Sequence, residues 1–196
     1  MIKSVRTRES IIENAFDLIY LKGYQATSID DILSRTKVTK GAFYYHFKSK
    51  DAMGLAVISE IIYPEIHNSL ILPIKNSSKP VKDIYRTIEQ TLFKASFFKA
   101  SLGCPLSNMI QEMSPLNADF VLALGKIKEE WRETLMHSIR SGKKAGRIRP
   151  GLDESGIADF IISTYWGVRN LGKLEKSAVC YIHYLDELKR YLKSLQ

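Results

Sequence analysis

The chain has 196 residues, of which 45% are hydrophobic and 26% are charged. This composition is typical of a globular protein with one or two domains, and it excludes a chain that is disordered throughout. The formal net charge of +8 favours a polyanionic partner without identifying one.

No segment of the sequence has the pattern of a signal peptide or a membrane span. The first residues, MIKSVRTRES, are charged and lead into no apolar region, whereas a span needs a run of roughly 18 apolar residues. We therefore expect a cytoplasmic protein without a membrane partner. Without a signal peptide, Cys104 and Cys180 indicate neither a disulfide framework nor a metal-ligand pair, so we expect reduced thiols.

The first 55 residues carry the signals of several short helices. Apolar residues at positions i, i+3, i+4 and i+7 predict a helix over residues 7–22, which Gly23 ends. Ser28 and Asp31 have the spacing of a capping box and predict a second helix of about two turns. After a turn, Thr39 is a suitable N-cap for a third helix.

The third predicted helix has two different faces. Phe43 and Phe47 lie four residues apart and share one face, while Lys40 and Tyr44 share another. Gly41 costs up to about 1 kcal/mol of helix propensity relative to alanine, which favours a place where another backbone approaches closely. Two short helices joined by a tight turn are typical of a helix-turn-helix motif, whose second helix enters the DNA major groove.

The stretch GYQATSIDDILSRTKVTKGAFYYHFKSKDAM, residues 23–53, resembles the N-terminal domain of the tetracycline-repressor (TetR) family of bacterial transcriptional regulators. The likeness covers nearly all of residues 7–55. It implies a helix-turn-helix DNA-binding domain over residues 1–50, with the motif at about 28–47. It also implies a helical regulatory and dimerisation domain over residues 51–196, which begins with a connecting helix near Ser49.

The resemblance also implies which residues contact double-stranded operator DNA. Lysines near the third helix can neutralise phosphates, and hydroxyl groups can donate to phosphate oxygens. By resemblance, Lys40, Gly41 and Tyr45 face base edges, whereas Tyr44 and His46 contact the backbone. Two alternatives stay open, because Tyr45 can instead cover the first helix and His46 can be an ordinary surface histidine. The complete predicted DNA-binding set is Ser28, Thr39, Lys40, Gly41, Tyr44, Tyr45, His46 and Lys50.

The rest of the chain continues the helical pattern. A connecting helix runs to Pro64, which kinks or ends it, and a polar loop follows at residues 72–80. Helical periodicity then recurs around residues 84–95, 120–142, 157–171 and 179–195. Since no alternating strand pattern competes, we expect an all-α fold with a three-helix head and a helical body.

The two C-terminal helices are apolar on more than a narrow stripe, which predicts a second buried face. A homodimer supplies such a face, and the resemblance implies a four-helix bundle made by two protomers, whose symmetry matches a pseudo-palindromic operator. The alternative is a monomer in which these helices complete the protein's own core.

Aromatic and methionine side chains in the body suggest a pocket for a small-molecule effector. A mixture of such residues with a few polar groups is typical of ligand sites. The same residues at helical spacing also fit a plain hydrophobic core, so both interpretations stay open. The predicted ligand-binding set is Phe93, Asn108, Met113, Trp131, Tyr165 and Trp166.

The sequence shows no catalytic or metal-binding motif. The four histidines do not recur at metal-ligand spacing, and no phosphate-binding glycine motif occurs. We therefore expect a ligand-responsive repressor without enzymatic activity, cofactor or metal. The alternative is a small helical enzyme or a membrane-surface protein whose basic charge mimics DNA binding. Cys104 also has two readings, an inert thiol or an oxidant sensor at a helix start.

Overall fold

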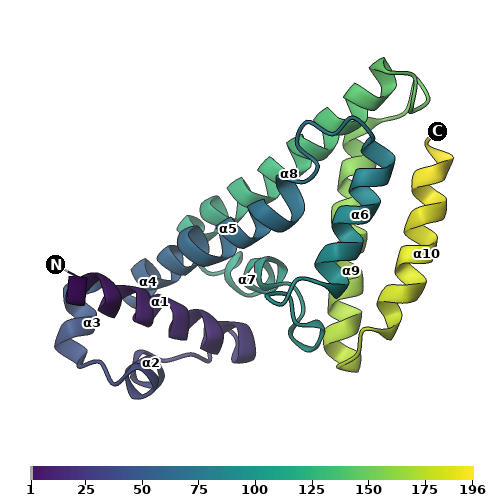
Figure 1. Cartoon of the computed structure of the whole chain (residues 1–196). Coiled ribbons are helices and arrows are strands. Elements are labelled where there is room, and N and C mark those ends of the chain that lie inside the picture. The colour runs from purple at the N-terminus through teal and green to yellow at the C-terminus, as the bar shows by residue number, and fades with distance from the viewer. Residues whose placement is uncertain (1) are drawn as a thin grey trace. The chain divides into compact units, whose positions relative to one another are not determined.

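The structure is a computed structural model that describes residues 2–196, with side chains from Ser4 onward. All regular secondary structure in this range is helical, as predicted (Figure 1). The α-helices are α1 (Ile2–Lys22), α2 (Ile29–Thr36), α3 (Lys40–His46), α4 (Lys50–Val57), α5 (Tyr63–Ile66), α6 (Pro80–Phe93), α7 (Pro105–Met113), α8 (Ala118–Lys144), α9 (Glu154–Glu175) and α10 (Val179–Ser194).

The chain forms two compact units. The first unit contains Met1–Pro64 and Pro105–Gly125, and the second contains Glu65–Cys104 and Lys126–Gln196. The first unit therefore combines the predicted head with α7 and the beginning of α8, which lie far along the sequence.

Helix α1 is longer than predicted, because it begins at Ile2 rather than at residue 7. The added residues contain no glycine or proline, so nothing in them interrupts the helix. The guanidinium of Arg8 donates two hydrogen bonds of 2.6 Å to the Glu60 carboxylate. Gly23 ends the helix as predicted, with φ +94° and its N–H donating to the Ile19 carbonyl at 2.8 Å.

Side-chain caps define the next two helices at the predicted positions. The Ser28 hydroxyl accepts from the Asp31 N–H at 3.0 Å, and the Asp31 carboxylate accepts from the Ser28 N–H at 2.8 Å. The Lys22 ammonium, 2.8 Å away, and the Ser28 donors hold the pKa of the Asp31 carboxyl well below its usual range. Thr39 caps α3 by accepting from the Ala42 N–H at 3.3 Å.

Pro64 does not end the connecting segment. The chain stays helical from Lys50 to Ile71, and two π-helical segments, η1 (Ile58–Ile62) and η2 (His67–Ile71), flank α5. Proline lacks the N–H that an α-helical hydrogen bond needs, and such wider turns accommodate an interrupted hydrogen-bond ladder. Of the two predicted alternatives at Pro64, a kink or a helix end, the helix end is therefore excluded.

The second unit has its core between α6, the second half of α8, α9 and α10. Helix α10 packs against both α6 and α9 (Figure 1). The buried residues follow the predicted helical spacing. They include Ile84, Ile88, Leu92, Trp131, Leu135, Ile161, Tyr165, Leu185 and Leu188. Helices α8 and α9 extend beyond their predicted ranges, whereas α6 begins and ends earlier than predicted and α10 ends at Ser194.

A buried arginine joins α9 to the loop that follows α6. The Arg169 guanidinium is fully buried and donates to the carbonyls of Phe98, Lys99 and Gly103. These hydrogen bonds compensate the large cost of burying its charge. The sequence pattern did not predict this role, since Arg169 lies between Val168 and Asn170 in a helix of ordinary amphipathic pattern.

Candidate nucleic-acid interface

Helix α3 has one buried face and one open face. Phe43 and Phe47 are buried, and the Arg8 guanidinium lies 5.2 Å from the centre of the Phe47 ring. Tyr44 and Tyr45 are 47% and 79% exposed. The separation into two faces is therefore as predicted, and the high exposure of Tyr45 excludes the alternative that this side chain covers α1.

The N-terminal turn of α3 is accessible to a large partner. Thr39, Lys40 and Gly41 are all exposed. A Cβ atom placed on Gly41 meets no described atom within 4 Å, so the space beside this glycine is open. His46, near the other end of the helix, is half-buried and lies edge-on to the Tyr45 ring, with 5.0 Å between the ring centres.

Two of the predicted contact residues also have structural roles. The exposed Ser28 hydroxyl forms the cap of α2 and donates to the Asp31 carboxylate at 2.7 Å. The Lys50 ammonium lies over the Tyr24 ring, 4.3 Å from its centre, and burial lowers its pKa. Lys48 is the more exposed lysine of this turn.

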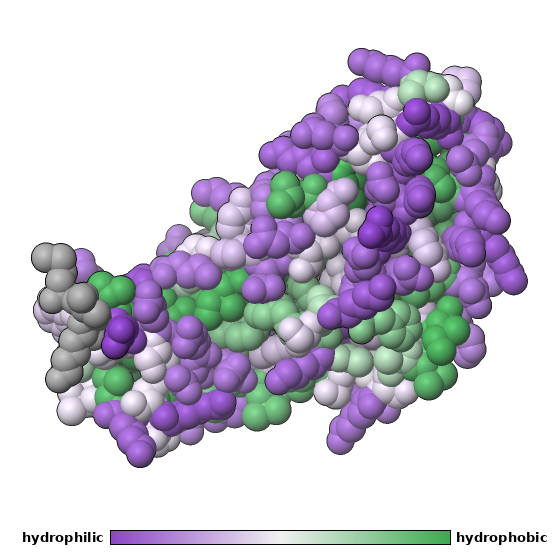
Figure 2. Space-filling view, viewed as in Figure 1, coloured by the Kyte–Doolittle hydropathy of each residue, from purple (hydrophilic) through white to green (hydrophobic). Residues whose placement is uncertain are grey.

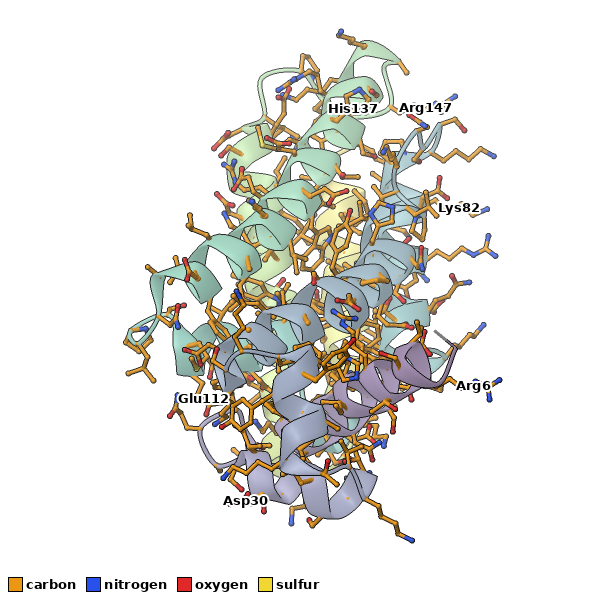
Figure 3. All side chains as sticks on the ribbon, turned by 90° about the vertical axis from the view of Figure 1, so that its left-hand side faces the viewer. Arg6, Asp30, Lys82, Glu112, His137 and Arg147 are labelled. Atoms are coloured by element: carbon orange, nitrogen blue, oxygen red, sulfur yellow. The ribbon has the colours of Figure 1, made fainter. Side chains whose placement is uncertain are left out.

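A carboxylate from α7 holds the turn between α1 and α2. The two oxygens of Glu112 accept hydrogen bonds from the backbone N–H groups of Tyr24, at 2.8 Å, and Gln25, at 2.5 Å (Figure 3). The Tyr24 hydroxyl in turn donates to Asp51 at 2.5 Å, at the start of α4. These contacts fix the position of the helix-turn-helix segment within the first unit.

Sequence reasoning missed Glu112. Helix α7 itself did not appear among the predicted periodic helices, because it is nine residues long and has too few turns to show a period. The segment GCPLSNMIQEM contains Glu112 but no local pattern that indicates which backbone groups the carboxylate accepts from.

The open face of α3 has the chemistry of a DNA-contacting surface. Lys40 can neutralise a phosphate or donate to a guanine, and the tyrosine hydroxyls can donate to phosphate oxygens. Within residues 2–196, no group of three or more histidine, cysteine or acidic side chains could hold a metal ion. None of the helices in this range is long and apolar enough to cross a membrane.

Comparison with known protein families matches both parts of the chain. The profile of the bacterial regulatory proteins of the tetR family matches residues 11–57, which include α2 and α3. The profile of tetracyclin repressor-like C-terminal domains matches residues 88–187, about half of the chain. The chain belongs to the TetR family. It is therefore a DNA-binding transcriptional regulator, as the helix-turn-helix pattern predicted.

Individual relatives support the assignment of this chain to the TetR family. It is 28% identical over 174 residues to the HTH-type transcriptional repressor DhaR of Mycobacterium sp. strain GP1, covering 87% of this chain and 84% of that protein. It is 31% identical over 133 residues to an uncharacterized HTH-type transcriptional regulator in the lacX 3' region of Lactococcus lactis, covering 68% of each chain. The crystal structure of a TetR transcriptional regulator from Chloroflexus aurantiacus superimposes with a TM-score of 0.88 at 27% identity, over 98% of this chain and 97% of that one.

The predicted effector residues of the TetR regulator do not lie in a single unit. Asn108 and Met113 belong to the first unit. Asn108 lines a cavity of about 10 Å³, too small for an effector, and the Met113 sulfur accepts from the Gln25 amide at 3.4 Å. In the second unit, Trp131 and Tyr165 are fully buried and meet edge to face, with ring centres 5.4 Å apart.

The remaining two predicted effector residues and Cys104 also have defined surroundings. Phe93 is 47% exposed and meets the Tyr181 ring edge to face, with 6.0 Å between centres. Trp166 is half-buried. Cys104 is fully buried, which favours an inert thiol over an accessible oxidant sensor.

Proposed function

We propose that this TetR regulator is a repressor, which binds a pseudo-palindromic operator as a homodimer and is released by a small-molecule effector. The open face of α3 is the observation that carries the proposal. Buried Phe43 and Phe47 hold this short helix in place, while the side chains between them extend into solvent. A major groove about 12 Å wide can admit such a helix.

The proposed contacts fall into two groups. Lys40, Gly41 and Tyr45 read base edges, as the family resemblance implies, and all three are exposed on α3. The others position the protein on phosphates, and they are Ser28, Thr39, Tyr44, His46 and Lys50. Ser28 and Thr39 are the N-caps of their helices, and helix N-termini attract phosphates because their first backbone N–H groups have no partner within the helix.

The proposed dimer surface is an exposed apolar stripe on the last two helices. We call it the α9–α10 face, and Figure 2 shows hydrophobic surface at the lower right, where α9 ends and α10 begins. Isolated exposed apolar residues are normal, but several of them on two helices that pack together, as α9 and α10 do, favour an interaction site. The α9–α10 face consists of Phe160, Leu171, Leu174, Val179 and Ile182.

The proposed effector binds in the second unit, beside Trp131, Tyr165 and Trp166. The indole N–H groups of Trp131 and Trp166 are buried, and neither finds a hydrogen-bond acceptor within the described part of the chain. An unsatisfied buried donor costs about 1–3 kcal/mol. A largely apolar ligand with one acceptor satisfies such a donor, and Phe93 is the further candidate in this unit.

Loss of the Lys40 ammonium tests the base-reading role. The operator is first located by footprinting the protein on the DNA that flanks its own gene. Lys40→Ala is expected to weaken operator binding by about 1–3 kcal/mol and to relax the preference at one position of each half-site. Lys48→Ala is the matched control, because it removes an exposed lysine beyond α3. It should lower affinity for operator and random DNA alike and reduce the salt dependence.

The comparison of the two lysine variants decides the assignment. Each is titrated against the operator and against random DNA of equal length at two salt concentrations. An equal loss on both DNAs for Lys40→Ala would assign this residue to phosphate contact and remove it from the base-reading group.

Tryptophan emission tests the effector proposal. A compound that packs against Trp131 or Trp166 should change the emission and lower operator affinity roughly 5- to 150-fold, which corresponds to a coupling of about 1–3 kcal/mol. By the same linkage, bound operator must lower the affinity of the protein for the compound by the same factor. The Trp131→Phe variant should retain DNA binding but bind the compound more weakly.

A panel of apolar compounds with and without a hydrogen-bond acceptor provides the control. If none of them changes emission or operator affinity, the body serves for dimerisation alone and the regulator binds DNA constitutively.

A further inference from the structure

The second unit contains a cleft that the proposed DNA and effector sites do not use. Its volume is about 380 Å³, within the usual range of small-molecule sites. The first turns of α6, the last turns of α10 and the turn after α8 form its walls. None of the five residues of the α9–α10 face lines this cleft.

Five cationic side chains surround the cleft. Figure 3 shows Lys82 and Arg147 projecting on the same side of the second unit. None of the described residues that line the cleft has an acidic side chain, and none of the five cations forms an ion pair with a described carboxylate. The five are Lys79, Lys82, Arg147, Lys189 and Lys193.

The five cleft cations lack the ion pairs that several other cations of the same unit form. Lys128, Arg132, Arg140, Lys143 and Arg190 each have a carboxylate oxygen within 3.1 Å. The nearby carboxylates are Asp83, which accepts from the Ser77 hydroxyl at 2.6 Å, and Glu89, which accepts from the Tyr85 hydroxyl at 3.4 Å. Burial, together with the charges of Glu89 and Asp186, raises the pKa of Tyr85. Five cations lining one cleft, none of them in an ion pair with a described carboxylate, favour an anionic ligand.

The floor of the cleft is apolar. Pro80 and Leu192 are buried there, and Val81 and the Tyr85 ring are half-buried beside them. The Lys189 ammonium lies 5.9 Å from the centre of the Tyr85 ring. A fully hydrated inorganic anion leaves this floor uncovered, whereas a ligand with an apolar skeleton covers it and places its anionic group among the lysines.

We propose that this cleft binds a small amphipathic anion, with an apolar skeleton and a phosphate, sulfonate or carboxylate group. The skeleton packs on Pro80, Tyr85 and Leu192, and the anionic group accepts hydrogen bonds from Lys82, Arg147 and Lys193. The proposal concerns binding alone, so it stands or fails independently of the operator and of the effector site beside Trp131.

Calorimetric titration of the full chain with 1-naphthyl phosphate tests the proposal, with 1-naphthol as the neutral compound of the same skeleton. We expect saturable binding of one naphthyl phosphate per protomer, at least about tenfold tighter than naphthol and weakened by salt. Inorganic phosphate should compete poorly. Equal affinity for the two naphthyl compounds would overturn the anionic part of the proposal.

A matched pair of double variants locates the site. The double variant Lys82→Gln with Lys193→Gln should lower the affinity for naphthyl phosphate at least about tenfold. Lys126→Gln with Lys144→Gln removes the same charge from exposed positions of α8 outside the cleft and should change affinity little. Thermal melts check that both variants are folded.

Three outcomes contradict the proposal. Equal weakening in the two double variants would show a general charge effect. No saturable binding of naphthyl phosphate would show that the cleft takes no such ligand. Binding to vesicles of anionic phospholipid without binding to naphthyl phosphate would assign the basic residues to a membrane surface instead.

Discussion

Glutamate at both Leu171 and Ile182 is expected to produce folded monomers that bind the operator about 10²- to 10⁴-fold more weakly. These side chains are 50% and 54% exposed in the protomer, so a charge there does not disturb its own core. In the proposed dimer the same positions are buried, and an unpaired charge in an apolar interface is costly. A monomer can place only one DNA-binding head on the operator, so the gain in affinity from two linked binding events is lost.

Sedimentation velocity at micromolar concentration and DNA titration measure the two effects together. Leu72→Glu with Leu122→Glu is the matched control, since these leucines are 52% and 64% exposed and lie outside the α9–α10 face. Persistence of the dimer in the Leu171→Glu and Ile182→Glu double variant would show that the protomers meet elsewhere. Leu185 and Leu192 are poor test positions, because they are buried within the protomer and a charge there unfolds it.

Replacement of Gly54 by valine is expected to lower the free energy of unfolding of the first unit by about 3 kcal/mol. A Cβ atom at this position lies 2.6 Å from a Tyr24 ring carbon and 2.8 Å from a Phe120 ring carbon. Both rings are buried, and the hydrogen bond from the Tyr24 hydroxyl to Asp51 restrains one of them. The overlap must therefore displace α4 or separate it from its neighbours.

Urea unfolding followed by circular dichroism measures the change, and DNA titration at 25 °C shows whether the head still binds. Gly125→Ala in α8 is the control, because a Cβ atom there meets no described atom within 4 Å and alanine favours the helix. An unchanged urea midpoint for Gly54→Val would show that α4 can shift without cost, contrary to the tight packing of the two rings.

Local sequence patterns were sufficient for the helices and for the faces of α3. The capping box of Ser28 and Asp31 and the N-cap at Thr39 depend on residues three positions apart, so the sequence contains all the interacting partners. Phe43 and Phe47 were predictable for the same reason, since helix geometry alone puts residues four apart on one face. The all-helical fold and the family likewise followed from short-range periodicity and a recognisable segment.

Contacts between distant residues could not be predicted in this way. Glu112 accepts hydrogen bonds from Tyr24 and Gln25, which lie more than 80 positions earlier in the chain, and Arg169 bonds to carbonyls about 70 positions away. No local pattern contains both partners of such a contact. Whether Pro64 kinks or ends the helix stayed open for a related reason, because the surrounding chain, through its two π-helical segments, decides whether a proline ends a helix.

The sequence by itself determined the helical periodicity, the caps, the helix-turn-helix motif and the family, because each of these depends on neighbours along the chain. Tertiary structure decided that Asn108 and Met113 belong to a different compact unit from Trp131, that Glu112 supports the turn at Tyr24, and that five cations gather around one cleft. Lysines at 79, 82, 189 and 193 are ordinary surface residues in the sequence. Packing of α10 on α6 brings them together, since burial of apolar faces, and not sequence distance, determines which helices meet.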